Sequence, residues 1–178
     1  MKKIGIVTDS HSSISQEEAE KLGIFVLPMP FYIDGECFYE SVTLSRELFF
    51  EKLAAGADIT TSQPSPTAVM EIWDKALEQF EKILYLPISS GLSGSYETAM
   101  MLAKDEAYEG RVLVVDDGQV AAPLHQMVLD TLDMIKKGYE AEQIRDLLER
   151  AGDRMMIYIA LQTLECLKKG GSGVGICV

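Results

Sequence analysis

Residues 89–95, Ser-Ser-Gly-Leu-Ser-Gly-Ser, combine four serines with two glycines and have the chemistry of an anion site. This serine turn follows the apolar run 83–87 and precedes a helical pattern over residues 96–108. The start of a helix carries unpaired backbone N–H groups and a partial positive charge, and serine hydroxyls add further donors. Gly91 and Gly94 would let a ligand approach the backbone closely. The same composition is also typical of an ordinary turn and helix cap, so the stretch alone leaves both interpretations open.

A second polar turn, here called the threonine turn, covers residues 60–66 and offers similar donors. Two polar pairs, Asp9-Ser10 and Asp116-Asp117, directly follow apolar runs. In parallel sheets, ligands bind beyond the carboxyl ends of the strands, near a switch in strand order. We therefore expect the strand-end pairs and the serine turn to share one edge of a sheet.

Catalysis is a competing interpretation of the serine turn. The stretch 91–95 differs from the nucleophile elbow of serine hydrolases, because its second glycine follows the serine directly. His11 and His125 are the histidines available as base, and each is more typical of a surface or structural histidine. No phosphate-binding glycine motif follows a strand, and no metal-ligand spacing is present. The pair Asp116-Asp117 could hold Mg²⁺, but a turn at a strand end explains it better.

Apolar runs alternate with helical patterns along most of the chain. The strand patterns cover residues 4–10, 24–33, 36–39, 83–87, 112–115 and 155–161. The helical patterns cover residues 15–23, a stretch from Thr43 or Ser45 to about residue 55, and residues 66–80, 96–108, 120–137, 141–150 and 163–169. Asp34-Gly35 predicts a hairpin, and Trp73 lies on the apolar side of its helix. This alternation predicts an α/β fold, with a mainly parallel sheet and helices on both faces.

Composition restricts the class of protein. The chain has 178 residues, 47% of them hydrophobic, and a net charge of −12, which disfavours nucleic acid as a partner. The acidic residues fall mostly in helical patterns, where they predict solvated faces. Cys37, Cys166 and Cys177 lack the spacing of a metal site and fit a reducing compartment. With no signal peptide or membrane-length apolar run visible, we expect a cytoplasmic protein.

Four segments together resemble the DegV family. They are Ile6–Ser10, Thr61–Ser65, Ile88–Tyr96 and Leu164–Gly171, in the family's order and across essentially the whole chain. The resemblance implies a Rossmann-like domain and a bacterial, lipid-binding protein that takes a long-chain fatty acid and no other cofactor. It also implies a partner, the kinase subunit of the fatty acid kinase system, which phosphorylates the bound carboxylate to an acyl phosphate for phospholipid synthesis. The DegV protein itself would not be an enzyme.

The resemblance assigns roles to residues of both turns. Thr61, or its neighbour Ser62, and Ser93 would hydrogen-bond the fatty acid carboxylate, while Gly91 and Gly94 would shape the serine turn. Four further residues would lie close by: Asp9, Ser10, Ser90 and Ser95.

Two features depart from the family pattern. The glycine pair Gly170-Gly171 is followed by Ser172 and Gly173, where the family has arginine and isoleucine. The family also continues into a second domain, so we expect residues 1–152 to form the first domain and 153–178 the truncated start of the second. An uncovered apolar surface would favour self-association. Two alternatives stay open: an enzyme acting on an acyl or phosphorylated substrate at Ser93, or an inactive truncated domain.

Overall fold

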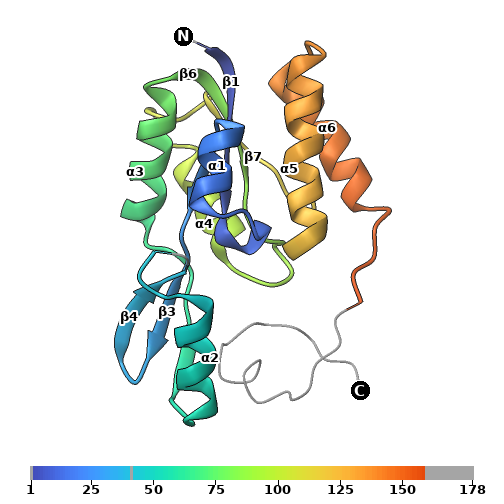
Figure 1. The fold of residues 1–178 in the computed structure, drawn as a ribbon. Helices are drawn as coiled ribbons and strands as arrows, with labels where there is room; N and C mark the ends of the chain where they lie inside the picture. The colour runs from blue at the N-terminus through green and yellow to red at the C-terminus, as the bar shows by residue number, and fades with distance from the viewer. Residues whose placement is uncertain (1, 41, 159–178) are drawn as a thin grey trace.

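The computed structural model describes residues 2–40 and 42–158, and its centre is a four-stranded parallel sheet (Figure 1). The strands are β1 (Lys2–Asp9), β2 (Phe25–Leu27), β6 (Phe80–Leu86) and β7 (Val112–Val114). Their order is β2-β1-β6-β7. The sheet therefore grows from β1 first to one side and then to the other, which places the switch point between β1 and β6.

Helices cover both faces of this sheet. One face carries α1 (Gln16–Leu22), α5 (Ala121–Lys136) and α6 (Ala141–Gly152), and the other carries α3 (Pro66–Leu77) and α4 (Ser95–Leu102). Because successive strand residues point to opposite faces, Leu84 packs with the first group, whereas Ile83 and Tyr85 pack with the second. Burial on both sides explains the continuous apolar runs. The predicted α/β fold with a parallel sheet is confirmed.

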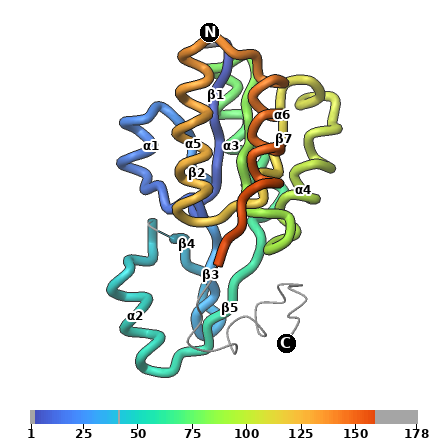
Figure 2. The backbone as a smooth tube through the Cα atoms, turned by 90° about the vertical axis from the view of Figure 1, so that its right-hand side faces the viewer, coloured from blue at the N-terminus to red at the C-terminus, as the bar shows by residue number. Residues whose placement is uncertain are grey.

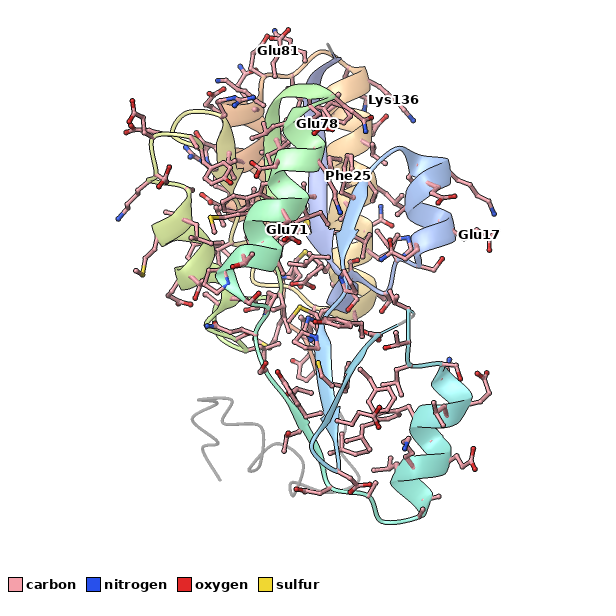
Figure 3. The ribbon with its side chains drawn as sticks, turned by 90° about the vertical axis from the view of Figure 1, so that its left-hand side faces the viewer. Glu17, Phe25, Glu71, Glu78, Glu81 and Lys136 are labelled. Atoms are coloured by element: carbon pink, nitrogen blue, oxygen red, sulfur yellow. The ribbon has the colours of Figure 1, made fainter. Side chains whose placement is uncertain are left out.

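Acidic side chains lie on the outer faces of helices. Figure 3 shows Glu71 on α3, Glu78 directly after the last residue of that helix and Glu17 on α1, and all three are exposed. On the inner side of α3, Trp73 is fully buried and meets the ring of Tyr85 edge-on, as expected for a core residue. None of the described helices is long and apolar enough to cross a membrane.

A smaller antiparallel unit, here called the arm, lies beyond the carboxyl ends of the parallel strands (Figures 1 and 2). It consists of β3 (Pro30–Ile33), β4 (Glu36–Tyr39), α2 (Arg46–Ala54) and β5 (Ile59–Thr61), with strand order β4-β3-β5. Asp34 and Gly35 both have positive φ, so the predicted hairpin is confirmed. No residue of α2 is buried, so this helix covers the arm only loosely.

The arm accounts for one wrong prediction. The sequence predicts a turn at Thr60 and Thr61, but these residues form the end of β5 and pair with Tyr32 and Phe31. Threonine favours strands as well as turns. The partner strand, supplied from almost thirty residues earlier in the chain, decides between them.

Three helix or strand ends also differ from the predictions. Phe80, predicted as the end of a helix, begins β6 opposite Lys2, and its ring lies where a Cβ on Gly5 would stand. The predicted helix 96–108 ends at Leu102. Residues 155–158 have no regular structure, and the rest of the predicted strand 155–161, like the predicted helix 163–169, lies outside the described residues.

Candidate functional site

The serine turn and the threonine turn meet in one open pocket of about 630 Å³ at the carboxyl end of the sheet. Six of the residues singled out from the sequence line it: Thr61, Ser62, Ser90, Gly91, Ser93 and Gly94. Phe31 of the arm and Met29, directly before β3, supply an apolar wall. Two segments about thirty residues apart in the sequence therefore present their donors to the same space.

Backbone hydrogen bonds to the loop after β7 hold the start of the serine turn. The N–H of Ser89 donates to the carbonyl of Gln119 at 2.9 Å, and the N–H of Ser90 donates to Asp116 Oδ1 at 3.3 Å. Asp116 thus works as a turn residue, and the described residues contain no His, Cys, Asp and Glu cluster suited to a metal. The turn is positioned by a neighbouring strand end.

Ser95 holds the hydroxyl of Ser93 so that its hydrogen stays free to be donated. The Oγ of Ser93 accepts hydrogen bonds from the backbone N–H of Ser95 at 3.2 Å and from its hydroxyl at 2.9 Å. A serine oxygen has two lone pairs and one hydrogen, so these bonds leave the Ser93 hydrogen to be donated. Ser95 is itself buried and does not line the pocket, so it acts by positioning Ser93.

The start of α4 also faces this pocket. Gly94 is its N-cap residue and offers no side chain to the first helical N–H groups. Such N–H groups attract anions, and a Cβ on Gly91 would meet only Ser89 Oγ at 3.5 Å, so the backbone there is open to a ligand. Neither glycine has positive φ among the described backbone angles, so the backbone conformation does not require glycine at these positions.

Gln63 joins the two turns. Its Oε1 accepts a hydrogen bond from the hydroxyl of Thr98 in α4 at 3.3 Å, and it would lie 3.3 Å from a Cβ on Gly94. The neighbouring Ser62 donates its hydroxyl to the carbonyl of Gln63 at 3.0 Å. The threonine turn is therefore fixed against the helix start that follows the serine turn.

Asp9 lies behind the pocket. Its side chain is fully buried, with Oδ2 accepting the N–H of Ile88 at 2.8 Å and Oδ1 accepting the N–H of His11 at 2.9 Å. Ser10 lines a neighbouring pocket, where its hydroxyl donates to Glu40 and accepts the N–H of Met29. Asp9 therefore braces the ends of β1 and β6, and Ser10 ties the end of β1 to the segments next to β3 and β4. Both lie near the predicted site without lining the pocket.

His11 lines the pocket, which the sequence did not reveal. Its Nδ1 lies 3.2 Å from Asp9 Oδ1. Burial lowers the pKa of His11, but the hydrogen bond to Asp9 and the charges of Asp9 and Glu40 outweigh it, so the pKa is raised above 6.5. Its place directly after the polar end of β1 was the available signal. By contrast, His125 in α5 pairs with Glu18 and lies outside this pocket.

These features define what the site can hold. Hydroxyls and a helix start suit an anionic group, and the apolar side chains of Met29, Phe31, Ile88 and Leu92 suit a hydrocarbon attached to it. Of the described residues lining the pocket, none is lysine or arginine, and Glu97 adds a carboxyl group.

The protein-family model described as "Uncharacterised protein, DegV family" matches residues 3–173 of this chain. This chain belongs to the DegV family. A DegV domain-containing protein of Caldanaerobacter subterraneus is 31% identical over 96% of this chain and 61% of its own length. Another, of Deinococcus radiodurans, is 34% identical over 94% of this chain and 59% of its own length. The chain thus spans roughly three-fifths of these curated DegV relatives.

Solved structures of DegV proteins share the fold. A DegV family protein from Thermus thermophilus, described for its fatty acid binding, aligns with a TM-score of 0.76 at 32% identity over 85% of this chain and 54% of that one. DegV from Bacillus subtilis, described as a fatty acid binding protein, aligns with a TM-score of 0.76 at 24% identity over 86% of this chain and 55% of that one. At 24% identity, the alignment with the Bacillus subtilis protein shows a shared fold only.

Proposed function

We propose that this DegV protein binds a long-chain fatty acid, with the carboxylate held between the serine and threonine turns. The observation that carries the proposal is one pocket in which hydroxyl donors, the start of α4 and an apolar wall converge. The fatty acid binding described for the Thermus thermophilus relative supports the same ligand class.

In this proposal the head group is recognised by short hydrogen bonds. Ser93 donates its free hydrogen, and Thr61 donates from the opposite turn. Ser62 would donate in its place only after releasing its hydrogen bond to the carbonyl of Gln63. The backbone at Gly91 and Gly94 lets the carboxylate approach the start of α4. Hydrogen bonds to a charged acceptor are about twice as strong as neutral ones. Each buried CH₂ of the tail would add about 0.8 kcal/mol.

The finer function is part of the same proposal. A cytoplasmic carrier would present the bound carboxylate to a separate kinase subunit, which would form the acyl phosphate used in phospholipid synthesis. The opening of the pocket leaves the head-group region accessible, which suits transfer to a partner. Residues 1–152 would form the first domain, in agreement with the end of α6 at Gly152, and 153–178 would begin the second.

Native mass spectrometry with stearic acid tests the ligand. We expect a one-to-one adduct with the wild-type chain and affinity about tenfold lower, or worse, in Ser93→Ala, because a hydrogen bond to a charged group is lost. Thr67→Ala removes an exposed hydroxyl outside the pocket and serves as the matched control. No adduct with folded wild-type protein would contradict binding by this chain and favour the inactive truncated domain.

An acyl-transfer enzyme is the second candidate, because the Asp9–His11 pair stands at the same pocket as Ser93. A buried carboxylate beside an imidazole is the usual support of a general base. However, the described structure has no hydrogen bond between His11 and a serine hydroxyl. Turnover of an acyl ester that is lost in Ser93→Ala would favour this candidate, whereas a stoichiometric fatty acid without turnover would favour the carrier.

A further inference from the structure

His11 stands out by charge among the residues of the pocket. It belongs to the short 3-10 helix Ser10–Ser12 that follows β1, and its side chain is 29% exposed. Among the described lining residues it is the one side chain that can become positively charged. A carboxylate entering this pocket would therefore find its only cationic partner, within the described part of the chain, at this position.

The imidazole is held in one orientation. Its Nδ1 faces Asp9 Oδ1 at 3.2 Å, and Asp9 is fixed in turn by the N–H groups of His11 and Ile88. A carboxylate partner favours the tautomer with hydrogen on Nδ1. The other ring nitrogen, Nε2, is left for a ligand, to which it donates only when the ring is protonated.

The groups around the ring are acidic. Asp9 at the end of β1 and Glu40 after β4 raise the pKa of His11 against the effect of its burial. Glu97 of α4 lines the same pocket, and Asp116 accepts the N–H of Ser90 beside it. On α5, which packs against the 3-10 helix, the titratable His125 is paired with Glu18 of α1.

We propose that protonated His11 pairs with the carboxylate of the bound fatty acid, so that binding tightens as the pH falls through the titration of this ring. The proposal rests on the proposed function and names a partner that hydroxyl donors alone do not provide. In an acidic pocket, the protonated ring offsets the repulsion between the ligand and neighbouring carboxylates. By linkage, the bound fatty acid must raise the pKa of His11 in turn.

His11→Asn tests this role because the asparagine amide can donate to Asp9 in place of Nδ1–H but lacks Nε2 and the charge. Stearic acid affinity is measured by calorimetry at about pH 6 and about pH 8, the range in which histidine titrates. We expect the wild type to bind about tenfold more tightly at the lower pH, and His11→Asn to bind weakly and equally at both. His125→Asn changes a residue outside the pocket and should keep the wild-type dependence of stearic acid affinity on pH. Binding of uncharged stearyl alcohol to the wild type should not depend on pH.

The outcomes separate this proposal from the proposed function. Wild-type binding that does not change with pH, or a pH profile that survives in His11→Asn, would overturn the role of His11 and leave the fatty acid carrier standing. Absence of wild-type binding at both pH values would overturn both. If His11→Asn does not fold, NMR titration of the wild-type imidazole decides: a titration midpoint that stays in place when stearic acid binds refutes the pairing.

Discussion

Replacing Asp117 by asparagine should stabilise the protein at neutral and alkaline pH. Asp117 is 1% exposed, and its Oδ1 accepts the N–H of Gln119 at 3.0 Å. Its Oδ2 and the Oε1 of Gln119 are buried without a hydrogen-bond partner among the described residues. Burial, with smaller contributions from the charges of Asp116 and Asp9, raises the pKa of Asp117 from 3.8 to about 7.

The direction in which stability changes with pH follows from the protons that the folded and unfolded states bind. Between pH 3.8 and about pH 7 the folded protein holds a proton on Asp117 that the unfolded chain has lost, so stability falls as the pH rises through this range. Each pH unit within it costs about 1.4 kcal/mol. The whole shift therefore corresponds to at most about 4 kcal/mol, and the part between about pH 5 and about pH 8 to about 2.5 kcal/mol. Asp117→Asn cannot ionise and avoids this loss while keeping an acceptor for Gln119.

Urea denaturation at about pH 5 and about pH 8 measures the difference directly. We expect the stability advantage of Asp117→Asn over wild type to grow by about 2.5 kcal/mol between the two. Asp116→Asn, the same change at the neighbouring and less buried residue, should keep most of the wild-type pH dependence, because the charge of Asp116 contributes less than burial to the raised pKa of Asp117. An Asp117→Asn advantage that is equal at both pH values, or absent at the higher one, would refute the argument from burial.

Two further substitutions test how the site is built. Gly152→Ala should destabilise the protein by about 2 kcal/mol or more in urea denaturation, because the new Cβ would stand 2.1 Å from the carbonyl oxygen of Asp117 and overpack the loop; a change below about 0.5 kcal/mol would contradict that contact. Gly91→Ala should leave stability within about 0.5 kcal/mol, since Ser89 Oγ at 3.5 Å is an ordinary neighbour, but should weaken stearic acid binding in calorimetry; unchanged affinity would show that the ligand does not approach this backbone.

Local chemistry made the parallel sheet and its polar edge predictable. The serine turn lies at the carboxyl end of β6 as expected, because an apolar run followed by serine and glycine encodes both the buried strand and its exit. The hairpin at Asp34 and Gly35 is equally local. The third strand of the arm was not predictable in this way, since Thr60 and Thr61 become a strand only through pairing with β3. Phe80 was assigned to the wrong element because apolar spacing alone does not mark where a helix ends.

The site also combines features that local sequence predicts with features that depend on contacts formed in the folded chain. Thr61, Ser62, Ser90 and Ser93 could be chosen by residue type and strand-end position, and the structure brings them to one pocket. The pocket position of His11 depends on its hydrogen bonds with Asp9, a residue whose burial is a property of the folded sheet. Binding by the chosen residues, the domain boundary near residue 152 and self-association stay predictions, because the geometry alone does not test them.

The hydrogen bonds behind the pocket give a physical reason why an acidic chain would hold the proposed anion at this point. Ile88 donates to Asp9 at the end of β1, while Ser89 and Ser90 donate to Gln119 and Asp116 after β7. The segment leaving β6 is thus fixed by the strand on each side of it. Two of these contacts use the carboxylates of Asp9 and Asp116 as acceptors for backbone N–H groups, while Ser90 and Ser93 line the pocket. In the proposed function, recognition of the head group would therefore depend on the sheet edge itself, which the described residues contain, and not on the net charge of the chain.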